Sequence, residues 1–207
     1  AGWYDDEHTA YGIPFPPLWE RFERLEEQLA VITGLWGTPL GGRFSFEGKH
    51  YQLSDSPGLP KPVQAPGPPV IVGGAGPRRT PRLAATFAHE FNMPFCPVAD
   101  TDRQYERVRV ACASVGRDPA SVVFSAAQTV CCGRNQTEIA ARAESIGRGV
   151  DELREDGLCG TPDEVVSKLA TFAEVGAGRV YLQLLDLQDH DHLTLLGQEV
   201  LPGCAPL

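Results

Sequence analysis

The sequence predicts an α/β fold with a parallel sheet, and three observations support this class. Short β-branched runs without polar alternation are typical of parallel strands covered on both faces, and Val70, Ile71 and Val72 form the first of them. A glycine-rich turn joins that run to a helical pattern, as in a βα unit. Strand and helix patterns then alternate along the rest of the chain, which favours parallel strands connected by helices.

The composition is that of a folded protein with a sizeable core. The chain has 207 residues, of which 42% are hydrophobic and 22% charged. Its net charge of −9 argues against nucleic acid as a partner, because that binding rests on basic residues that neutralise phosphates, so any anion site must be local. The sequence has no signal-peptide pattern and no apolar run of about 18 residues, and we therefore expect a cytoplasmic protein without a membrane partner.

The cysteine and histidine residues do not indicate a metal site. The cysteines lack CxxC or Cys/His ligand spacing, so buried thiols of a cytosolic protein explain them best. They are Cys96, Cys112, Cys131, Cys132, Cys159 and Cys204. His190 and His192 alternate with Asp189 and Asp191 on a predicted loop, but this spacing is unspecific. We expect these histidines to be solvated and the protein to bind no metal.

The first third of the chain is predicted to form one long helix and a turn-rich insertion. Apolar residues recur at helical spacing over 18–36 with charged residues between them, which predicts a helix packed on a core. Residues 37–69 form the insertion, and the alternating stretch 44–53 predicts a small hairpin within it. The chain opens with Ala1 instead of a methionine, so we expect it to be part of a longer protein.

The remaining elements alternate in type. Thr161 and Pro162 have the residue types of an N-cap and a first helical position, so a helix is expected to open there and to end at Gly176 and Gly178. The predicted strands are 70–73, 90–93, 121–132 and 179–185, and the other predicted helices are 78–88, 103–115, 137–154 and 192–201.

The turn after the first strand has the chemistry of a phosphate-binding loop. Gly73, Gly74 and Gly76 allow positive φ angles and close approach of an anion to the backbone, and the helix that follows directs its positive end to the same place. Arg78 and Arg79 at that helix start oppose the dipole preference, which a bound anion would explain. The predicted residues are Gly73, Gly74, Ala75, Gly76, Arg78, Arg79 and Thr80. The alternative is a structural βα turn, since the spacing matches neither GxGxxG nor GxxxxGK[ST].

Several ordered motifs resemble a known family. They are Gly2-Trp3-Tyr4 with Glu7 and His8, the stretch from Tyr11 to Pro17, Glu20-Arg21-Phe22, Phe46 to Tyr51, Gly73 to Gly76 with Thr80, and Gly160-Thr161-Pro162. Together they resemble the luciferase-like monooxygenase superfamily, and most of all its class of deazaflavin (F420)-dependent oxidoreductases. The resemblance runs over nearly the whole chain.

This resemblance implies a partial (β/α)8 TIM barrel. The chain would begin at the end of the fourth strand and supply about strands five to eight, as a single domain over 1–207 with an insertion at 37–69. A whole barrel needs eight strands and typically about 250 residues. The stretch 89–92 departs from the family, which usually has Ala-Asp-Gly or a similar sequence before the sixth strand.

The resemblance also implies a site and a reaction. Active sites of such barrels lie at the carboxyl ends of the strands, which adds Tyr4, Glu7 and Asn92 to the glycine loop as cofactor-site residues. Glu7 and His8 are candidate acids or bases, with a solvated surface run as the alternative. The implied reaction is hydride transfer between a reduced deazaflavin or flavin and a small organic substrate, with oxygen as a co-substrate in the monooxygenase branch.

Two cofactors and three functions are considered, and the first function is the oxidoreductase described above. Coenzyme F420 is favoured because Arg78, Arg79 and Arg82 would hold a phosphate and an acidic tail, with FMN as the alternative cofactor. The second hypothesis for the function is a non-catalytic half-barrel remnant or oligomerising module. The third is a sugar-phosphate-binding barrel enzyme without flavin. A partial barrel would expose strand edges near 70–73 and 179–185, so we expect a homo-oligomer.

Overall fold

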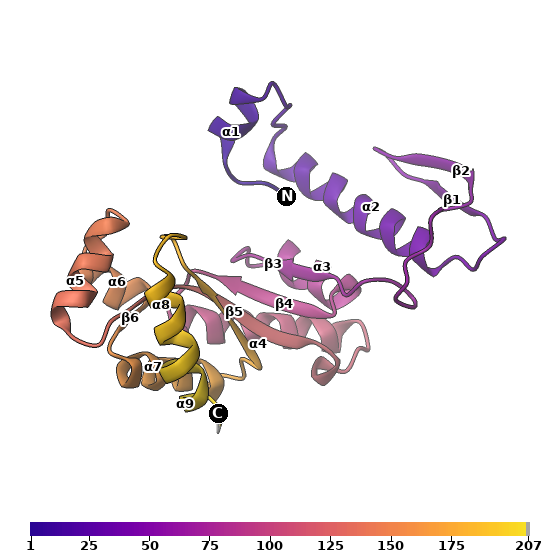
Figure 1. Ribbon diagram of the computed structural model, residues 1–207. Coiled ribbons are helices and arrows are strands. Elements are labelled where there is room, and N and C mark those ends of the chain that lie inside the picture. The colour runs from indigo at the N-terminus through magenta and orange to yellow at the C-terminus, as the bar shows by residue number, and fades with distance from the viewer. Residues whose placement is uncertain (206–207) are drawn as a thin grey trace. The chain divides into compact units, whose positions relative to one another are not determined.

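The computed structural model describes residues 1–205, and the chain divides into two compact units (Figure 1). The first unit is Ala1–Val70, and the second begins at Ile71. The expectation of one domain over residues 1–207 stays a prediction. No helix among the described residues is both long and apolar enough to cross a membrane.

The first unit consists of two helices and a hairpin. Helix α1 is Asp5–Ala10, α2 is Leu18–Gly37, and the antiparallel strands are β1 Phe44–Glu47 and β2 Gln52–Ser56. The Glu27 carboxylate of α2 accepts hydrogen bonds from the backbone N–H groups of residues 49, 50 and 51 at 2.9, 2.9 and 3.0 Å, which fixes the hairpin turn to the helix. The predicted long helix and hairpin are confirmed, but α2 has no buried residue, so the expected packing of this helix on a core is not borne out.

The second unit contains a parallel sheet of five strands. They are β3 Ile71–Gly73, β4 Glu90–Pro94, β5 Val123–Cys132, β6 Leu158–Gly160 and β7 Arg179–Gln183. The long strand β5 pairs with β4, β6 and β7, and β3 pairs with β4. The predicted parallel α/β sheet is confirmed.

Helices connect these strands. They are α3 Arg79–Phe87, α4 Val98–Ser114, α5 Gln136–Ser145, α6 Val150–Asp156, α7 Pro162–Glu174 and α8 His190–Leu195, followed by a π-helical turn Leu196–Val200 and α9 Leu201–Gly203; a 3-10 turn, Pro119–Ser121, precedes β5. The side chains of Asn135 and Thr161 cap α5 and α7. The predicted cap at Thr161 is therefore confirmed.

Two predicted elements need correction, and one strand was not predicted. The expected helix over 137–154 is two helices, because the chain turns through Gly147 at φ +68°. Strand β6 was not predicted, because it has only three residues between two helices. Helix α4 starts at Val98, five residues before the predicted Arg103, because Pro97 occupies its N-cap position.

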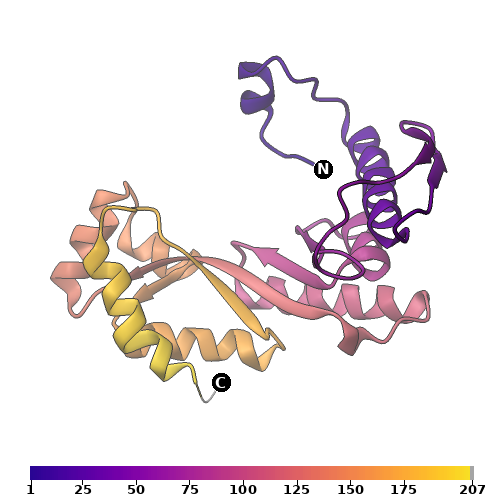
Figure 2. The same cartoon turned by 45° about the vertical axis from the view of Figure 1, so that its right-hand side comes forward.

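The two faces of the sheet differ in chemistry. Because neighbouring parallel residues point to the same side, Phe91 and Phe124 share one face, where their rings contact Tyr105 of α4. Helices α4 and α7 lie on this side in both views (Figures 1 and 2). The other face is polar. Ile71, which points to it, is 52% exposed, so the prediction that the first strand is buried on both faces is wrong.

Arg117 closes the carboxyl end of α3 and generates a stability prediction. Its guanidinium donates to the carbonyls of Ala85 at 3.1 Å and Ala88 at 2.7 Å. Arg117→Ala should lower the free energy of unfolding by about 2 kcal/mol, because these half-buried carbonyls lose charge-assisted bonds. Urea unfolding measures this. Arg148→Ala, which removes an (i, i+4) ion pair to Glu152, is the control and should cost about 0.5 kcal/mol or less. Equal losses for both variants would contradict the prediction.

Candidate cofactor-binding site

The glycine loop follows β3 at the carboxyl end of the strand, next to Asn92. Gly73 pairs with Asn92 in the parallel register, and the N–H of Gly74 donates to the carbonyl of Asn92 at 3.2 Å. Gly74 has φ +129°, a backbone angle that other residues rarely adopt. The structure thus brings together the predicted glycines and Asn92, which are distant in sequence.

A buried amide holds this loop from one side. Gln104 of α4 is 1% exposed, and its Nε2 donates to the carbonyls of Gly74 at 3.2 Å and Gly76 at 2.8 Å. The Gly74–Ala75 peptide is trans, so its N–H points opposite to the carbonyl. The N–H of Ala75 is therefore directed away from Gln104, toward the open side of the loop. Sequence reasoning missed Gln104, since nothing in the sequence distinguishes it from other polar helix residues.

The start of α3 adds a second set of donors. Arg78 is the N-cap residue and makes no side-chain capping bond, and the first turn of α3 has no acidic residue. Helices α5 and α7, in contrast, have capping side chains and acidic first turns. A helix start of this kind favours an anion through its dipole and backbone N–H groups.

Thr80 explains why Gly76 is a glycine. Thr80 is 5% exposed, and a Cβ on Gly76 would lie 2.7 Å from Thr80 Oγ1. A larger residue at position 76 would push the loop away from the helix start. The loop therefore packs against the first turn of α3, where a Cβ on Gly74 would also lie 3.8 Å from the Thr80 side chain.

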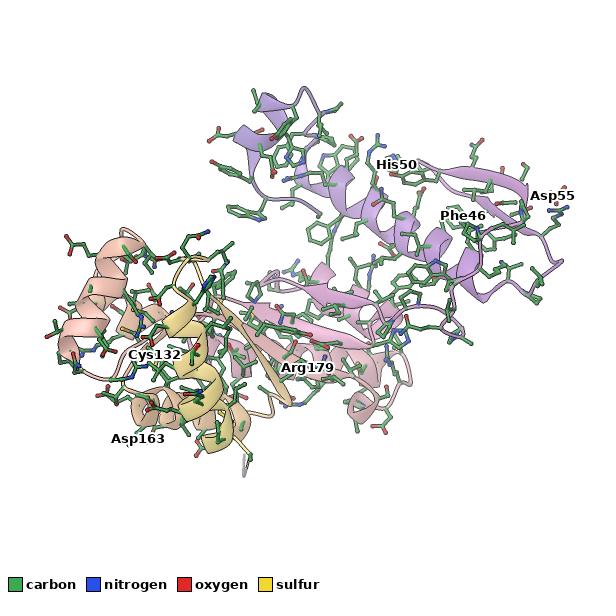
Figure 3. All side chains as sticks on the ribbon, in the orientation of Figure 1. Phe46, His50, Asp55, Cys132, Asp163 and Arg179 are labelled. Atoms are coloured by element: carbon green, nitrogen blue, oxygen red, sulfur yellow. The ribbon has the colours of Figure 1, made fainter. Side chains whose placement is uncertain are left out.

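Polar side chains continue from Asn92 across the second face of the sheet. Asn92 Nδ2 donates to Ser125 Oγ on β5 at 3.0 Å. Nearer the amino ends of the strands, the buried carboxylate of Glu90 accepts a hydrogen bond of 2.8 Å from the Tyr181 hydroxyl and forms an ion pair with Arg179. Figure 3 labels Arg179. This network was not predicted, because the sequence pattern indicated strands that are apolar on both faces. The face can orient a polar ligand.

The other predicted residues belong to the first unit. Tyr4 precedes α1, and its carbonyl accepts a hydrogen bond of 2.8 Å from His8 Nδ1. The His8 ring packs against Phe15 with 4.5 Å between ring centroids. Since Nδ1 is the donor, His8 Nε2 is left as a proton acceptor in the neutral ring. Glu7 is exposed on the first turn of α1. A joint role of Tyr4, Glu7 and His8 with the glycine loop stays a prediction.

The expectation that His192 is solvated is wrong. Asp189 Oδ1 accepts a hydrogen bond from the His192 backbone N–H, and His192 is only 5% exposed. Its Nε2 accepts from the backbone N–H of Cys132 at 3.0 Å, at the end of β5 (Figure 3). Arg142 donates to the Cys132 carbonyl at 2.8 Å and forms ion pairs with Asp189 and Asp191. Within residues 1–205, no three His, Cys, Asp or Glu side chains are grouped as a metal would require.

The comparisons with known proteins identify the family. The chain matches the model of the luciferase-like monooxygenase family over residues 1–157, so it belongs to that family, and the predicted membership is confirmed. An FMNH2-dependent dimethylsulfone monooxygenase of Pseudomonas putida is 36% identical over 75 residues, which cover 36% of this chain and 20% of that protein. An F420-dependent glucose-6-phosphate dehydrogenase of Nakamurella multipartita is 25% identical over 218 residues, which cover 92% of this chain and 62% of that protein.

A solved structure gives the same result for the fold. The F420-dependent secondary alcohol dehydrogenase in complex with an F420–acetone adduct superposes with a TM-score of 0.79 at 15% identity, over 92% of this chain and 64% of that chain. The chain spans less than two thirds of the length of each of these three proteins. Its parallel α/β sheet therefore resembles those of TIM-barrel-like proteins of the luciferase family.

The burial of His192 leads to a pH prediction. Burial and the charge of Arg142 hold the pKa of His192 below its ordinary value of 6.5, against the opposing effect of Asp189, Asp191 and Asp186. The unfolded chain then binds the proton more readily, so stability should be lost as pH falls below about 6.5. His192→Gln keeps an acceptor but removes the titration.

Unfolding free energies measured by urea from about pH 7 to pH 5 test this. The slope of stability against pH should be smaller in His192→Gln than in the wild type. His190→Gln is the matched control, because His190 is exposed on the same helix, and it should leave the slope unchanged. An unaltered slope in His192→Gln would contradict the assignment.

Proposed function

We propose that this chain belongs to an oxidoreductase that transfers hydride between reduced coenzyme F420, or FMN, and a small organic substrate. The observation that carries the proposal is the glycine loop, whose Gly74 and Gly76 carbonyls are held by Gln104 so that the Ala75 N–H points outward. The relatives support both cofactors, since they include F420-dependent dehydrogenases and FMNH2-dependent monooxygenases. When bound, the reduced cofactor supplies the hydride.

The donors of the loop fit a phosphate group. The Ala75 N–H, the amino end of α3 and the cationic side chains of Arg78 and Arg79 concentrate positive charge within a few residues. The low content of acidic groups in this turn supports the same ligand. We favour F420 over FMN because Arg82, one helical turn beyond Arg78, adds a cation for an acidic tail.

The remaining residues receive roles from the proposed barrel arrangement. Strands β3, β4, β5 and β7 would correspond to about strands five to eight of a (β/α)8 barrel, with the short β6 as an addition beside β5 and the site at the carboxyl ends of the strands. Asn92 would orient the ligand next to the loop, and Tyr4 and Glu7 would lie beside the redox ring. His8 Nε2, which is left as an acceptor, would hold or release a proton at the substrate.

The proposal includes a cytoplasmic homo-oligomer. Among the described strands, β3 pairs only with β4 and β7 only with β5, so both have an edge without a partner strand. Exposed edges favour association with another chain. A non-catalytic half-barrel or oligomerising module is the outcome that a failure of cofactor binding would favour.

Arg79 provides the first test. Arg79→Ala should weaken F420 or FMN binding by about 1.5–3 kcal/mol, the range for a charge-assisted hydrogen bond. Fluorescence titration of the full chain with each cofactor measures the affinities. Arg103→Ala is the control, because Arg103 is an exposed cation of α4 that pairs with Asp100, and its affinity should equal that of the wild type. Equal affinities for all three proteins would remove Arg79 from the site.

Gly76 provides the second test. Gly76→Ala should lower cofactor affinity by about 1–3 kcal/mol, because the new Cβ meets Thr80 Oγ1 and forces the loop to shift. Gly197→Ala is the matched control, since a Cβ there meets nothing within 4 Å. Circular dichroism verifies that both variants fold. If folded Gly76→Ala binds as tightly as the control, the loop is only a structural turn.

A further inference from the structure

Two thiols face each other across adjacent strands. Cys131 of β5 and Cys159 of β6 are paired residues in the parallel register, so both side chains point to the same side of the sheet. Adjacent strands lie about 4.8 Å apart. That spacing falls within the Cα separations of about 4.4–6.8 Å that disulfides span. The Cys131 thiol donates a hydrogen bond of 3.6 Å to the Ile139 carbonyl, and Cys159 lies beside it on the neighbouring strand. Neither residue has a role in the proposed hydride transfer.

The surroundings make the two thiols unequal. Lys168 Nζ donates to the carbonyl of Arg154 at 2.5 Å, which fixes a cation at the end of α6, just before β6. The adjacent Cys131 thiol and the charges of Arg154 and Lys168 lower the pKa of Cys159, although burial opposes the shift. The thiolate is the reactive form of cysteine, so Cys159 is the nucleophile of the pair and Cys131 the second thiol.

We propose that Cys131 and Cys159 form a redox-active dithiol that hydrogen peroxide converts into a disulfide. The Cys159 thiolate attacks one peroxide oxygen, the O–O bond breaks, and a sulfenic acid forms while the second oxygen leaves and is protonated to water. The Cys131 sulfur then attacks the Cys159 sulfur, the S–O bond breaks, and the hydroxyl leaves as water with the Cys131 proton. In total, two thiols are oxidised and one peroxide is reduced to two water molecules.

If exposure alone decided which cysteines are oxidised first, Cys96 and Cys204 would react before Cys131 and Cys159. Cys131 and Cys159 are 1% and 8% exposed, whereas Cys96 and Cys204 are half-buried and easier to reach. Burial raises the pKa of both Cys96 and Cys204, which keeps them as thiols. The pairing of Cys131 with Cys159 thus predicts that the less exposed thiols react first.

Peptide mapping tests the proposal. The full chain is treated with about one equivalent of hydrogen peroxide, blocked with N-ethylmaleimide and digested with trypsin. Cys131 lies in the tryptic peptide 118–134 and Cys159 in 155–168. We expect these peptides to be linked and to separate on reduction, with a mass two hydrogen atoms below the sum of the two peptides and the one N-ethylmaleimide carried by Cys132. Oxidation confined to Cys96 or Cys204, or no oxidation of the chain, would overturn the proposal.

Variants identify the sulfur atoms. Cys132→Ala should keep the linkage, because Cys132 points to the opposite side of β5 and packs in the other core cluster. Cys159→Ser should abolish it and leave Cys131 modified by N-ethylmaleimide after unfolding. If neither variant folds, the fragment spectrum of the linked wild-type peptides distinguishes Cys131 from Cys132. A bond to Cys132 would overturn the proposal.

The disulfide should also change stability. It would close a loop of 27 residues that contains α5 and α6, which restricts the unfolded chain. The oxidised protein should therefore unfold at a midpoint on the order of 5 °C above that of the reduced protein. The difference should be absent in Cys131→Ser.

Discussion

The second unit depends on the pairing of β5 with three other strands. Its first half bonds to β4, its middle to β7 and its carboxyl end to β6. A strand of ten residues is long enough to offer these different partners along its length. Among the described strands, none before β5 pairs directly with one after it, so β5 joins the two sides of the sheet. The glycine loop, the His192 cluster and the paired thiols all take their positions from this one strand.

The two faces of the sheet differ in the side chains that they bury. On the helix face, apolar side chains such as Phe91 and Phe124 bury against α4, and the main core cluster lies between β5, α7 and α8. On the other face, Glu90 and Asn92 alternate with Phe91 along β4, and each finds a partner on a neighbouring strand. A buried polar group is tolerated when it has such a partner. The polar face thus remains folded while it keeps groups that can orient a ligand.

The sequence predicts the larger elements well because their signals are local. Helix α2 follows from apolar spacing, the start of α7 from Thr161 and Pro162, and β3 with its loop from Val72 and the glycines after it. Properties set by distant residues escape such reasoning. Gln104 gains its role only when α4 packs beside the loop, and the three residues of β6 form a strand only because β5 is beside them.

The histidine error has the same physical origin. His192 lies among aspartates, a pattern typical of solvent-exposed loops, yet the Asp189 cap turns the first residues of α8 so that the ring meets the end of β5. Polar composition predicts exposure on average, but a buried acceptor is stable wherever one backbone N–H needs it. Local sequence cannot predict this contact, because the N–H belongs to Cys132, which is 60 positions away.

The contact of Glu90 with Arg179 also bears on how the strands find their alignment. Glu90 belongs to β4 and Arg179 to β7, and these strands have β5 between them, so the ion pair spans a strand that bonds to both. A slip of β7 by one residue would turn Arg179 and Tyr181 to the helix side and leave a buried carboxylate without its cation. Backbone hydrogen bonds alone accept either alignment. The ion pair thus favours the observed alignment of β7 over one shifted by a residue, because the shifted sheet would be less stable.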